Sequence, residues 1–252
     1  MIDIGLIELP PGETALFLDI DGTLLDIAAR PDDVVVPASL KADLGAAYGL
    51  LGGALALVSG RAVDEIDRLF SPLGLPASGV HGSEFRPSPP GRAERLAPRI
   101  PDDVRARAEA IIKQYPGALF EDKGIAIALH WRLAPQFGVA IEADAQAMME
   151  KAPSNLTLLR GHCVLEIKGA TLDKGMAVDR FLKEDAFRGR RPVFVGDDVT
   201  DESAFAAVTR HGGYAFAVGR EIDGTLDWFE SASDVRKWLA RMVGRGPMQA
   251  VA

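Results

Sequence analysis

Two short stretches decide the fold: Leu16-Phe17-Leu18-Asp19-Ile20-Asp21-Gly22-Thr23 and Val193-Phe194-Val195-Gly196-Asp197-Asp198-Val199-Thr200-Asp201-Glu202. Each begins with an apolar run that predicts a buried strand, and each ends in closely spaced carboxylates. Such carboxylates repel one another unless a cation lies between them, and Mg²⁺ is a hard cation that prefers oxygen ligands. The stretches are far apart in the sequence, so one metal could join them only if their strands are neighbours in one sheet.

The first part of the chain alternates between strand and helix patterns. Apolar runs at residues 15–18 and 55–58 predict buried strands, and residues 40–50 and 63–70 have helical patterns. This alternation is typical of a parallel sheet with helices on both faces, in which strands are continuous apolar runs. The proline-rich segment 86–92 predicts a loop. We therefore expect an α/β fold with a Rossmann-like parallel core.

The pattern changes in the middle of the chain and then returns. Residues 102–115 and 136–151 predict helices, and 125–132, 156–160 and 163–168 predict strands of a small α+β domain. One face of its sheet is polar, with His130, Arg132, Glu166 and Lys168. A helix from Lys174, a strand at 193–195 and a helix near 235–239 restore the first pattern. We expect a core of residues 1–97 and 171–252 with an inserted domain of residues 98–170.

The bulk composition is that of a soluble globular protein. The 252 residues are 48% hydrophobic and 25% charged, with a net charge of −8. Acidic proteins are poor partners for nucleic acid or anionic membranes, and no apolar stretch has the roughly 18 residues of a membrane span. The N-terminal residues lack the basic region of a signal peptide. The single cysteine, Cys163, excludes an internal disulfide and is expected to be buried in a strand. We expect a cytoplasmic monomer that binds neither nucleic acid nor membrane.

Four polar signals follow predicted strands or open the next helix, where ligands of open α/β sheets bind. Together they supply a carboxylate nucleophile, a hydroxyl, an ammonium group and metal ligands, which is the set that phosphoryl transfer through an aspartyl-phosphate requires. Some signals also have structural alternatives: a turn in the first, a helix N-cap in the second and a solvated helix start in the last. The signals are Asp19 with Asp21, Ser59-Gly60-Arg61, Lys174, and Asp197 with Asp198, Asp201 and Glu202.

In their order and spacing these signals resemble the four motifs of the haloacid-dehalogenase-like phosphatase superfamily. The resemblance implies that Asp19 attacks phosphorus. It implies that Asp21 protonates the leaving alkoxide and then activates water against the phosphoenzyme. Ser59 and Lys174 would hold the phosphoryl oxygens.

The same resemblance implies a magnesium site. Asp19, Asp197 and the backbone carbonyl group of Asp21 would bind Mg²⁺. Asp198 and Asp201 would fix metal-bound waters. The turn at Gly22 and Thr23 would present backbone N–H groups to the phosphate.

A finer resemblance is to the trehalose-6-phosphate phosphatase family. Thr-Asp-Glu after paired aspartates is its most discriminating feature, because it is unusual in the wider superfamily. Residues 98–170 resemble the cap domain of the family in size and pattern, so the expected fold is a haloacid-dehalogenase-type core with an inserted α+β cap. The motifs are Asp19-Ile20-Asp21-Gly22-Thr23-Leu24-Leu25 with Pro31 and Pro37, Ser59-Gly60-Arg61, Gly79-Val80-His81-Gly82-Ser83-Glu84, Leu129-His130-Trp131-Arg132 and Gly196-Asp197-Asp198-Val199-Thr200-Asp201-Glu202.

The family resemblance implies Mg²⁺-dependent hydrolysis of trehalose 6-phosphate. Other possibilities left open are a phosphatase of sucrose phosphate or glucosylglycerate phosphate, a sugar phosphomutase, and a catalytically silent sugar-phosphate sensor. In the cap, Lys123, His130, Arg132 and Glu166 match positions that grip sugar hydroxyls, and His81 either shapes its turn or contacts substrate. Further substrate contacts are expected at Gly22, Thr23, Gly60, Arg61, Thr200 and Glu202.

Overall fold

The computed structural model describes residues 9–28, 33–89 and 91–244, so Pro31 and the N-terminal residues considered above lie outside the description. Its larger sheet has the strand order β12-β11-β10-β1-β2-β3-β4-β5. The strands are parallel from β12 to β3 and antiparallel from β3 to β5. The α/β fold with a parallel core is therefore confirmed. The strands are β1 (Thr14–Leu18), β2 (Leu55–Val58), β3 (Ala77–Gly79), β4 (Glu84–Arg86), β5 (Glu94–Arg95), β10 (Arg191–Gly196), β11 (Tyr214–Val218) and β12 (Asp227–Phe229).

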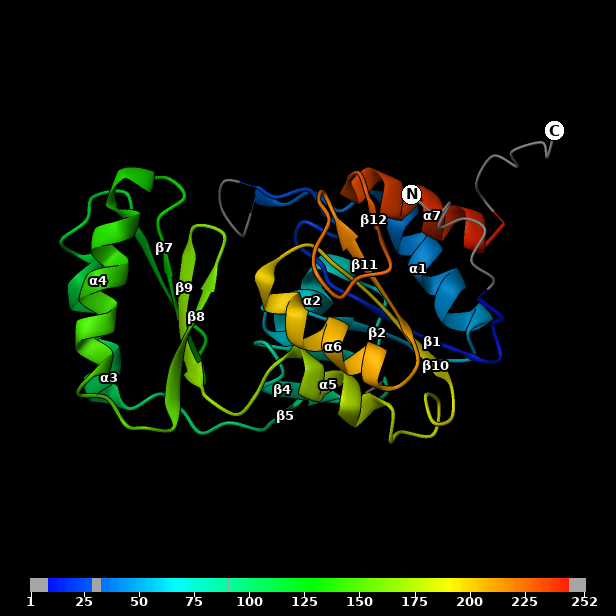
Figure 1. The fold of residues 1–252 in the computed structure, drawn as a ribbon, viewed down its shortest axis with the longest axis horizontal. Helices are drawn as coiled ribbons and strands as arrows, with labels where there is room; N and C mark the ends of the chain where they lie inside the picture. The colour runs from blue at the N-terminus through cyan, green and yellow to red at the C-terminus, as the bar shows by residue number, and fades with distance from the viewer. Residues whose placement is uncertain (1–8, 29–32, 90, 245–252) are drawn as a thin grey trace.

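Helices cover both faces of this sheet. Figure 1 shows α1 and α7 on one side of it and α5 and α6 on the other. In α2 the expected spacing is seen directly, because Val63, Ile66 and Phe70 share one helix face and are buried. Within the described ranges, we find no helix with the length and apolar character that a bilayer crossing requires. The helices are α1 (Ala38–Leu50), α2 (Val63–Phe70), α5 (Lys174–Phe181), α6 (Glu202–Arg210) and α7 (Ala232–Met242).

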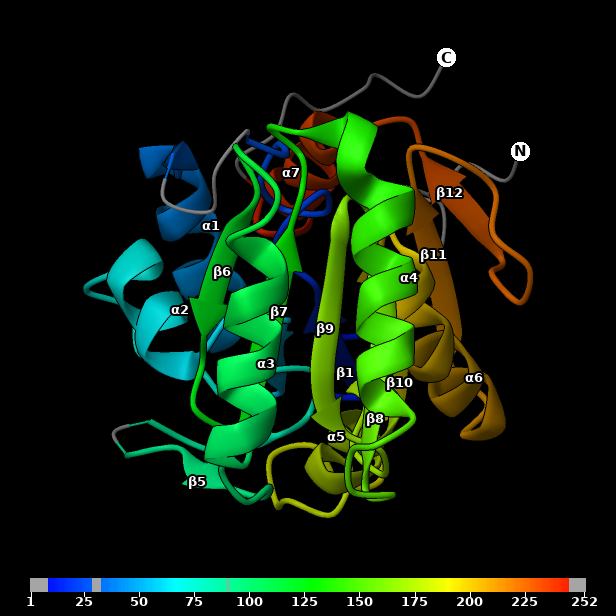
Figure 2. The same ribbon diagram turned by 90° about the vertical axis from the view of Figure 1, so that its left-hand side faces the viewer.

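A second, antiparallel sheet lies apart from the first and has the order β6-β7-β9-β8. In Figure 2, α3 and α4 lie in front of this sheet, and the larger sheet lies behind it. We call the segment from α3 to β9 the inserted unit, because it interrupts the chain that forms the parallel sheet. Its elements are α3 (Asp102–Ile112), β6 (Leu119–Asp122), β7 (Ala126–His130), the 3-10 helix η3 (Pro135–Phe137), α4 (Gly138–Met149), β8 (Leu156–Gly161) and β9 (Val164–Gly169).

Side-chain alternation gives the sheet of the inserted unit one apolar and one polar face. The register places Glu121 and Glu166 on either side of Ala128, and His130 lies two residues along the same strand. Residues two apart in a strand share a face, so these polar side chains lie together, away from α3 and α4. The other face packs in an apolar cluster that contains Ile127, Leu129, Leu165 and Ile167.

Three local expectations are wrong. Arg86 ends strand β4 and is not part of the following loop. Cys163 lies in the turn between β8 and β9 with a φ of 60°, and it is half-buried and not in a strand. Lys168 is not available to a ligand, because its ammonium donates to the backbone carbonyls of Gly169 and Leu172 and the side chain is buried.

Candidate active site

The carboxyl ends of β1 and β10 lie side by side, as the two acidic stretches require. The strands are parallel neighbours with Leu18 opposite Val195, and the backbone N–H of Asp19 donates to the carbonyl of Val195 at 3.0 Å. Asp19, Asp197 and Asp201 each place a carboxylate oxygen within 4.8 Å of the others. We call these three side chains the acidic group. The structure therefore brings together carboxylates from both stretches.

The turn after β1 is built around Asp197. Gly22 has a φ of +84°, and a Cβ at this position would lie 2.0 Å from Oδ2 of Asp197. Any other residue would therefore displace the carboxylate. The buried hydroxyl of Thr23 donates to Oδ1 of Asp197 at 3.4 Å. Gly22 and Thr23 thus support the acidic group.

Lys174 supplies the positive charge within the acidic group. It opens α5, where Asp173 caps the helix by accepting from the backbone N–H of Met176 at 2.8 Å. The buried ammonium donates to Asp19 at 2.9 Å and to Asp201 at 2.6 Å. Burial alone would lower the pKa of Lys174, but the two carboxylates outweigh it and raise that pKa. The ammonium is therefore charged at every physiological pH.

Asp201 and Asp198 both bind protein groups in the loop after β10. Oδ2 of Asp201 accepts from the backbone N–H groups of Asp197 and Asp198 at 3.0 and 3.1 Å. Asp198 accepts from the backbone N–H of Val199 at 2.7 Å and from that of His162 at 3.2 Å. Asp198 lies outside the acidic group, so its expected contact with metal-bound water stays a prediction.

The acidic group fits a divalent cation. Burial raises the pKa of Asp197 to about 7, and the nearby Asp201 adds to the effect. Burial also raises the pKa of Asp19 well above its ordinary value, although Lys174 opposes the shift. Neighbouring carboxylates with raised pKa values are stabilised in their ionised form by a cation placed between them, and Mg²⁺ binds carboxylate oxygens. Asp19 and Asp197 are the better candidate ligands, because protein donors already occupy both oxygens of Asp201.

Asp21 is not part of the acidic group and pairs with Arg61. Nε of the guanidinium lies 2.6 Å from Oδ2 and Nη2 lies 2.8 Å from Oδ1, which is a bidentate contact. The backbone N–H of Arg61 donates to Oγ of Ser59 at 3.2 Å. Burial lowers the pKa of Arg61, but Asp21 raises it by more. One loop therefore holds Ser59, which is expected to bind phosphate, and Arg61, the partner of the expected acid–base residue Asp21.

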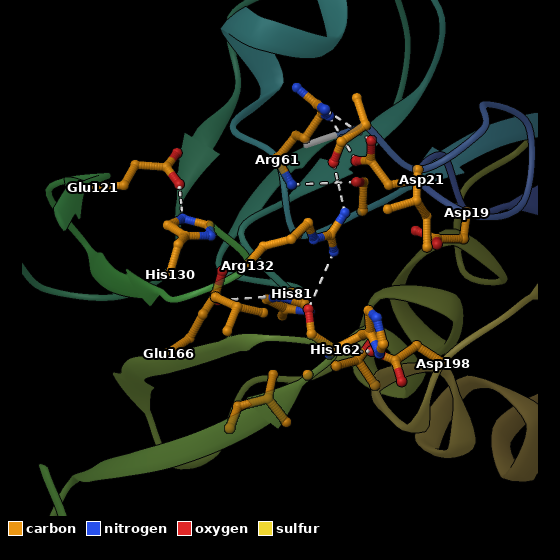
Figure 3. A pocket seen from close by; sticks show the side chains of 18 of the residues that line it. Asp19, Asp21, Arg61, His81, Glu121, His130, Arg132, His162, Glu166 and Asp198 are labelled. Carbon is orange, nitrogen blue, oxygen red and sulfur yellow. Dashed lines mark hydrogen bonds and ion pairs between the residues drawn. The ribbon is translucent and has the colours of Figure 1, made fainter. Parts of the chain in front are cut away.

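A cavity of about 190 Å³ lies between the acidic group and the polar face of the inserted unit (Figure 3). Its wall is formed by loops and helix starts at the end of the larger sheet and by strands and turns of the inserted unit. Glu202, in contrast, is exposed at the start of α6 and, like Gly22 and Thr23, does not line the cavity. The expected site residues that do line it are Asp19, Asp21, Ser59, Gly60, Arg61, His81, Lys123, His130, Arg132, Glu166, Lys174, Asp197, Asp198 and Thr200.

Glu166 is the centre of a buried cluster that joins the inserted unit to the core. Its Oε1 accepts from Nζ of Lys123 at 2.6 Å, and its Oε2 lies 3.0 Å from Nε2 of His81. Lys123 also donates to the backbone carbonyl of Gly60 at 2.9 Å. Burial alone would raise the pKa of Glu166, but Lys123 and His81 hold it well below its ordinary value. The cluster therefore contains an ionised carboxylate.

His130 pairs with Glu121, a cavity residue that the motifs do not single out. Nε2 of His130 lies 2.8 Å from Oε2 of Glu121. Burial favours the neutral carboxyl, but His130 and Lys123 hold the pKa of Glu121 below its ordinary value. Glu121 lies in β6 two residues before Lys123, which directly follows the end of that strand at Asp122. This spacing is the signal that could have found it.

Arg132 links the core to the turn between β8 and β9. Its guanidinium donates to the backbone carbonyl of Ala28 at 2.6 Å and to that of His162 at 3.2 Å. His162 also lines the cavity. No sequence pattern marks His162, because its position depends on how the turn docks against Asp198.

Comparison with known proteins identifies the family. The trehalose-phosphatase family model matches residues 17–227. A probable trehalose-phosphate phosphatase of Sinorhizobium fredii is 46% identical over 90% of this chain and 87% of its own length. The trehalose-6-phosphate phosphatase of Escherichia coli is 42% identical over 89% of this chain and 85% of its own length.

The fold is also that of known phosphatases. The C-terminal domain of Candida albicans trehalose-6-phosphate phosphatase superposes with a TM-score of 0.82 at 18% identity, over 92% of this chain and 93% of that domain. A phosphatase of the haloalkanoate enzyme superfamily from Bacteroides thetaiotaomicron gives a TM-score of 0.62 at 15% identity, over 92% of this chain and 95% of its own. With these matches and the paired acidic stretches at the ends of β1 and β10, the chain belongs to the trehalose-phosphatase family.

Proposed function

We propose that this protein hydrolyses trehalose 6-phosphate to trehalose and phosphate, with Asp19 as the nucleophile and Mg²⁺ at the acidic group. The cavity carries this proposal, because it leads from Asp19 and Lys174 to the charged side chains of the inserted unit. The phosphate fits the first end. The sugar has many hydroxyls and no charge beyond its phosphate. It fits the end of the cavity lined by the inserted unit, where charged side chains can make strong hydrogen bonds to hydroxyls.

In the first step, a carboxylate oxygen of Asp19 forms a bond to phosphorus while the bond from phosphorus to the sugar oxygen breaks. Lys174 and Ser59 bind the phosphoryl oxygens, over which the loose transition state spreads negative charge. Mg²⁺ held by Asp19 and Asp197 would supply further positive charge there. The leaving sugar oxygen takes a proton from Asp21.

In the second step, water gives a proton to Asp21 while its oxygen bonds to phosphorus. The bond between phosphorus and Asp19 breaks, which releases phosphate and restores the free carboxylate. Asp21 ends the cycle protonated, as the first step requires. Through its bidentate contact, Arg61 fixes the direction of the ionised carboxylate of Asp21, which is the form that takes the proton from water.

The first experiment measures phosphate release from trehalose 6-phosphate, sucrose 6-phosphate and glucose 6-phosphate, each with Mg²⁺ or with EDTA. We expect trehalose 6-phosphate to be hydrolysed in clear preference, and EDTA to abolish its hydrolysis. Metal-dependent release from another sugar phosphate would retain the chemistry and overturn the substrate. A glucose phosphate isomer without free phosphate would indicate a mutase, and no turnover of any ester would favour a sensor.

Arg61→Lys is expected to lower kcat about 10- to 100-fold on both trehalose 6-phosphate and p-nitrophenyl phosphate, because acid–base catalysis is worth 10²–10⁴-fold and lysine cannot replace the fork of donors on Asp21. Steady-state kinetics measure the effect. Arg68→Lys is the matched control, since Arg68 is exposed on α2 and its ion pair with Glu65 is long, at 3.4 Å. Unchanged kcat in Arg61→Lys would contradict the orienting role.

We also propose that residues 98–170 act as a cap domain on a core of residues 1–97 and 171–252, in a cytoplasmic monomer. The contacts of Lys123 with Gly60 and of Glu166 with His81 support the cap, because they close the cavity from the side of the inserted unit. A free cysteine fits a reducing compartment. Light scattering on a sizing column would reveal a dimer if the monomer prediction is wrong.

A further inference from the structure

The side chain of His81 crosses from the core to the inserted unit. His81 lies in the turn after β3 with a φ of 48°, and its backbone N–H donates to the carbonyl of Ser59 at 3.0 Å. Its Nε2 lies 3.0 Å from Oε2 of Glu166, and the two side chains are only 10% and 6% exposed (Figure 3). A core residue beside the catalytic loop therefore contacts a carboxylate that is expected to bind the sugar.

Gly60 leaves room for this contact. A Cβ at residue 60 would lie 2.5 Å from Nε2 of His81, so any other side chain would displace the imidazole. The carbonyl of Gly60 accepts from Lys123, which is the second partner of Glu166. The loop that carries Ser59 is thus shaped around one cluster of His81, Glu166 and Lys123.

Two atoms of this cluster lack a hydrogen-bond partner. Among the described residues, Nδ1 of His81 and Oε2 of Glu166 are buried without a well-aligned hydrogen bond, and the one polar contact of Oε2 is the approach of Nε2 of His81 at 3.0 Å. Leaving buried polar atoms unpaired costs free energy. Glu166 lines the cavity, and a carboxylate can accept several hydrogen bonds, so its carboxylate can take a further one from a sugar hydroxyl there.

We propose that His81 is a positioning residue for sugar recognition, which orients the Glu166 carboxylate so that it accepts a hydroxyl of the substrate. This inference rests on the proposed function. Burial lowers the pKa of His81 even though Glu166 opposes the shift, so the ring is neutral near pH 7 and can donate from Nε2. Without that donor, the partner that Glu166 keeps within the described part of the chain is the rotatable ammonium of Lys123, which directs a carboxylate poorly.

Two substitutions separate this role from a purely structural one. Glutamine places its amide NH₂ near the position of Nε2 and can still donate to Glu166, whereas asparagine reaches only the position of Nδ1. Asparagine, however, tolerates a positive φ better than glutamine does. If His81 only shapes the turn, His81→Asn should retain more activity than His81→Gln. If His81 positions Glu166, His81→Gln should retain more of the preference for the sugar phosphate than His81→Asn.

The readout is the KM for trehalose 6-phosphate divided by the KM for p-nitrophenyl phosphate, which has no sugar. We expect His81→Asn to raise this ratio about tenfold or more and His81→Gln to raise it less than about threefold, since one lost hydrogen bond to a charged group is worth about a factor of ten or more. Equal losses on both substrates, or asparagine outperforming glutamine, would overturn the inference.

A double-mutant cycle tests whether His81 acts through Glu166. We expect Glu166→Gln to raise the same ratio, and His81→Asn to add no further rise in the Glu166→Gln background. Additive effects would show that His81 acts independently. The matched control is His211→Asn, because His211 is an exposed histidine that pairs with Asp179 at 2.8 Å.

The same data distinguish failure of the inference from failure of the proposed function. Wild-type protein that hydrolyses p-nitrophenyl phosphate but no disaccharide phosphate would contradict both. Wild-type protein that prefers trehalose 6-phosphate, together with unchanged ratios in both His81 variants, would contradict the inference alone.

Discussion

Asp19→Asn is expected to lower kcat by about four orders of magnitude or more, because the amide cannot form the covalent bond to phosphorus. Phosphate release under single-turnover conditions measures the loss. Asp185→Asn is the matched control, since Asp185 is 96% exposed and, among the described residues, pairs with Arg188 alone, at 3.0 Å. A variant at Asp19 that keeps a tenth of wild-type activity would remove the nucleophile assignment.

The same substitution is expected to stabilise the metal-free protein near neutral pH. Burial and the nearby carboxylates raise the pKa of Asp19 well above the ordinary 3.8, so the folded state resists ionisation of this group. The resulting loss in the free energy of unfolding is absent below pH 3.8, grows as the pH rises toward the raised pKa, and is complete above that pKa. Asparagine removes this cost.

Thermal unfolding in EDTA therefore tests the burial of Asp19 independently of activity. The Tm of Asp19→Asn should exceed that of wild type by more at pH 7.5 than at pH 4.5. Mg²⁺ should reduce the difference, because a ligand that binds only the folded state stabilises it. A lower Tm for the variant at neutral pH would mean that the ion pair with Lys174 outweighs the cost of burial.

The sequence identifies the acidic group because its parts are local. Apolar runs mark β1 and β10, and carboxylates follow both. The requirement that one cation serves both clusters predicts that the strands are neighbours, and the pairing of Leu18 with Val195 confirms it. The α/β fold and the family follow from the same stretches.

Other features depend on tertiary contacts and short elements. Strands β3, β4 and β12 have three residues each, which is too short for periodicity to mark a strand. The contact of Arg61 with Asp21 follows from how two loops meet, and that of His81 with Glu166 from how the inserted unit docks. The sequence selects these residues for their chemistry, but it does not show that Arg61 and His81 hold other side chains in place.

Lys174→Met is the second substitution with a large expected effect. It should lower kcat by about three orders of magnitude, because a buried cation aimed at the developing charge is lost. It should also lower the free energy of unfolding by about 3–5 kcal/mol near neutral pH, because Asp19 and Asp201 then remain buried without their shared ammonium. Lys237→Met is the control, since Lys237 is 66% exposed in its pair with Asp234.

The pH dependence identifies the cause of this loss. Without Lys174, the pKa of Asp19 rises further, so the cost of burying its charged form is greatest at neutral pH and falls as acid protonates the carboxyl group. Urea unfolding should therefore show a smaller difference from wild type at pH 4.5 than at pH 7.5. Mg²⁺ should restore more stability to the variant than to wild type, since the cation would neutralise the same carboxylates. Equal destabilisation at both pH values would instead attribute the loss to packing of the lysine stem, and Lys174 would not be the charge that holds the acidic group together.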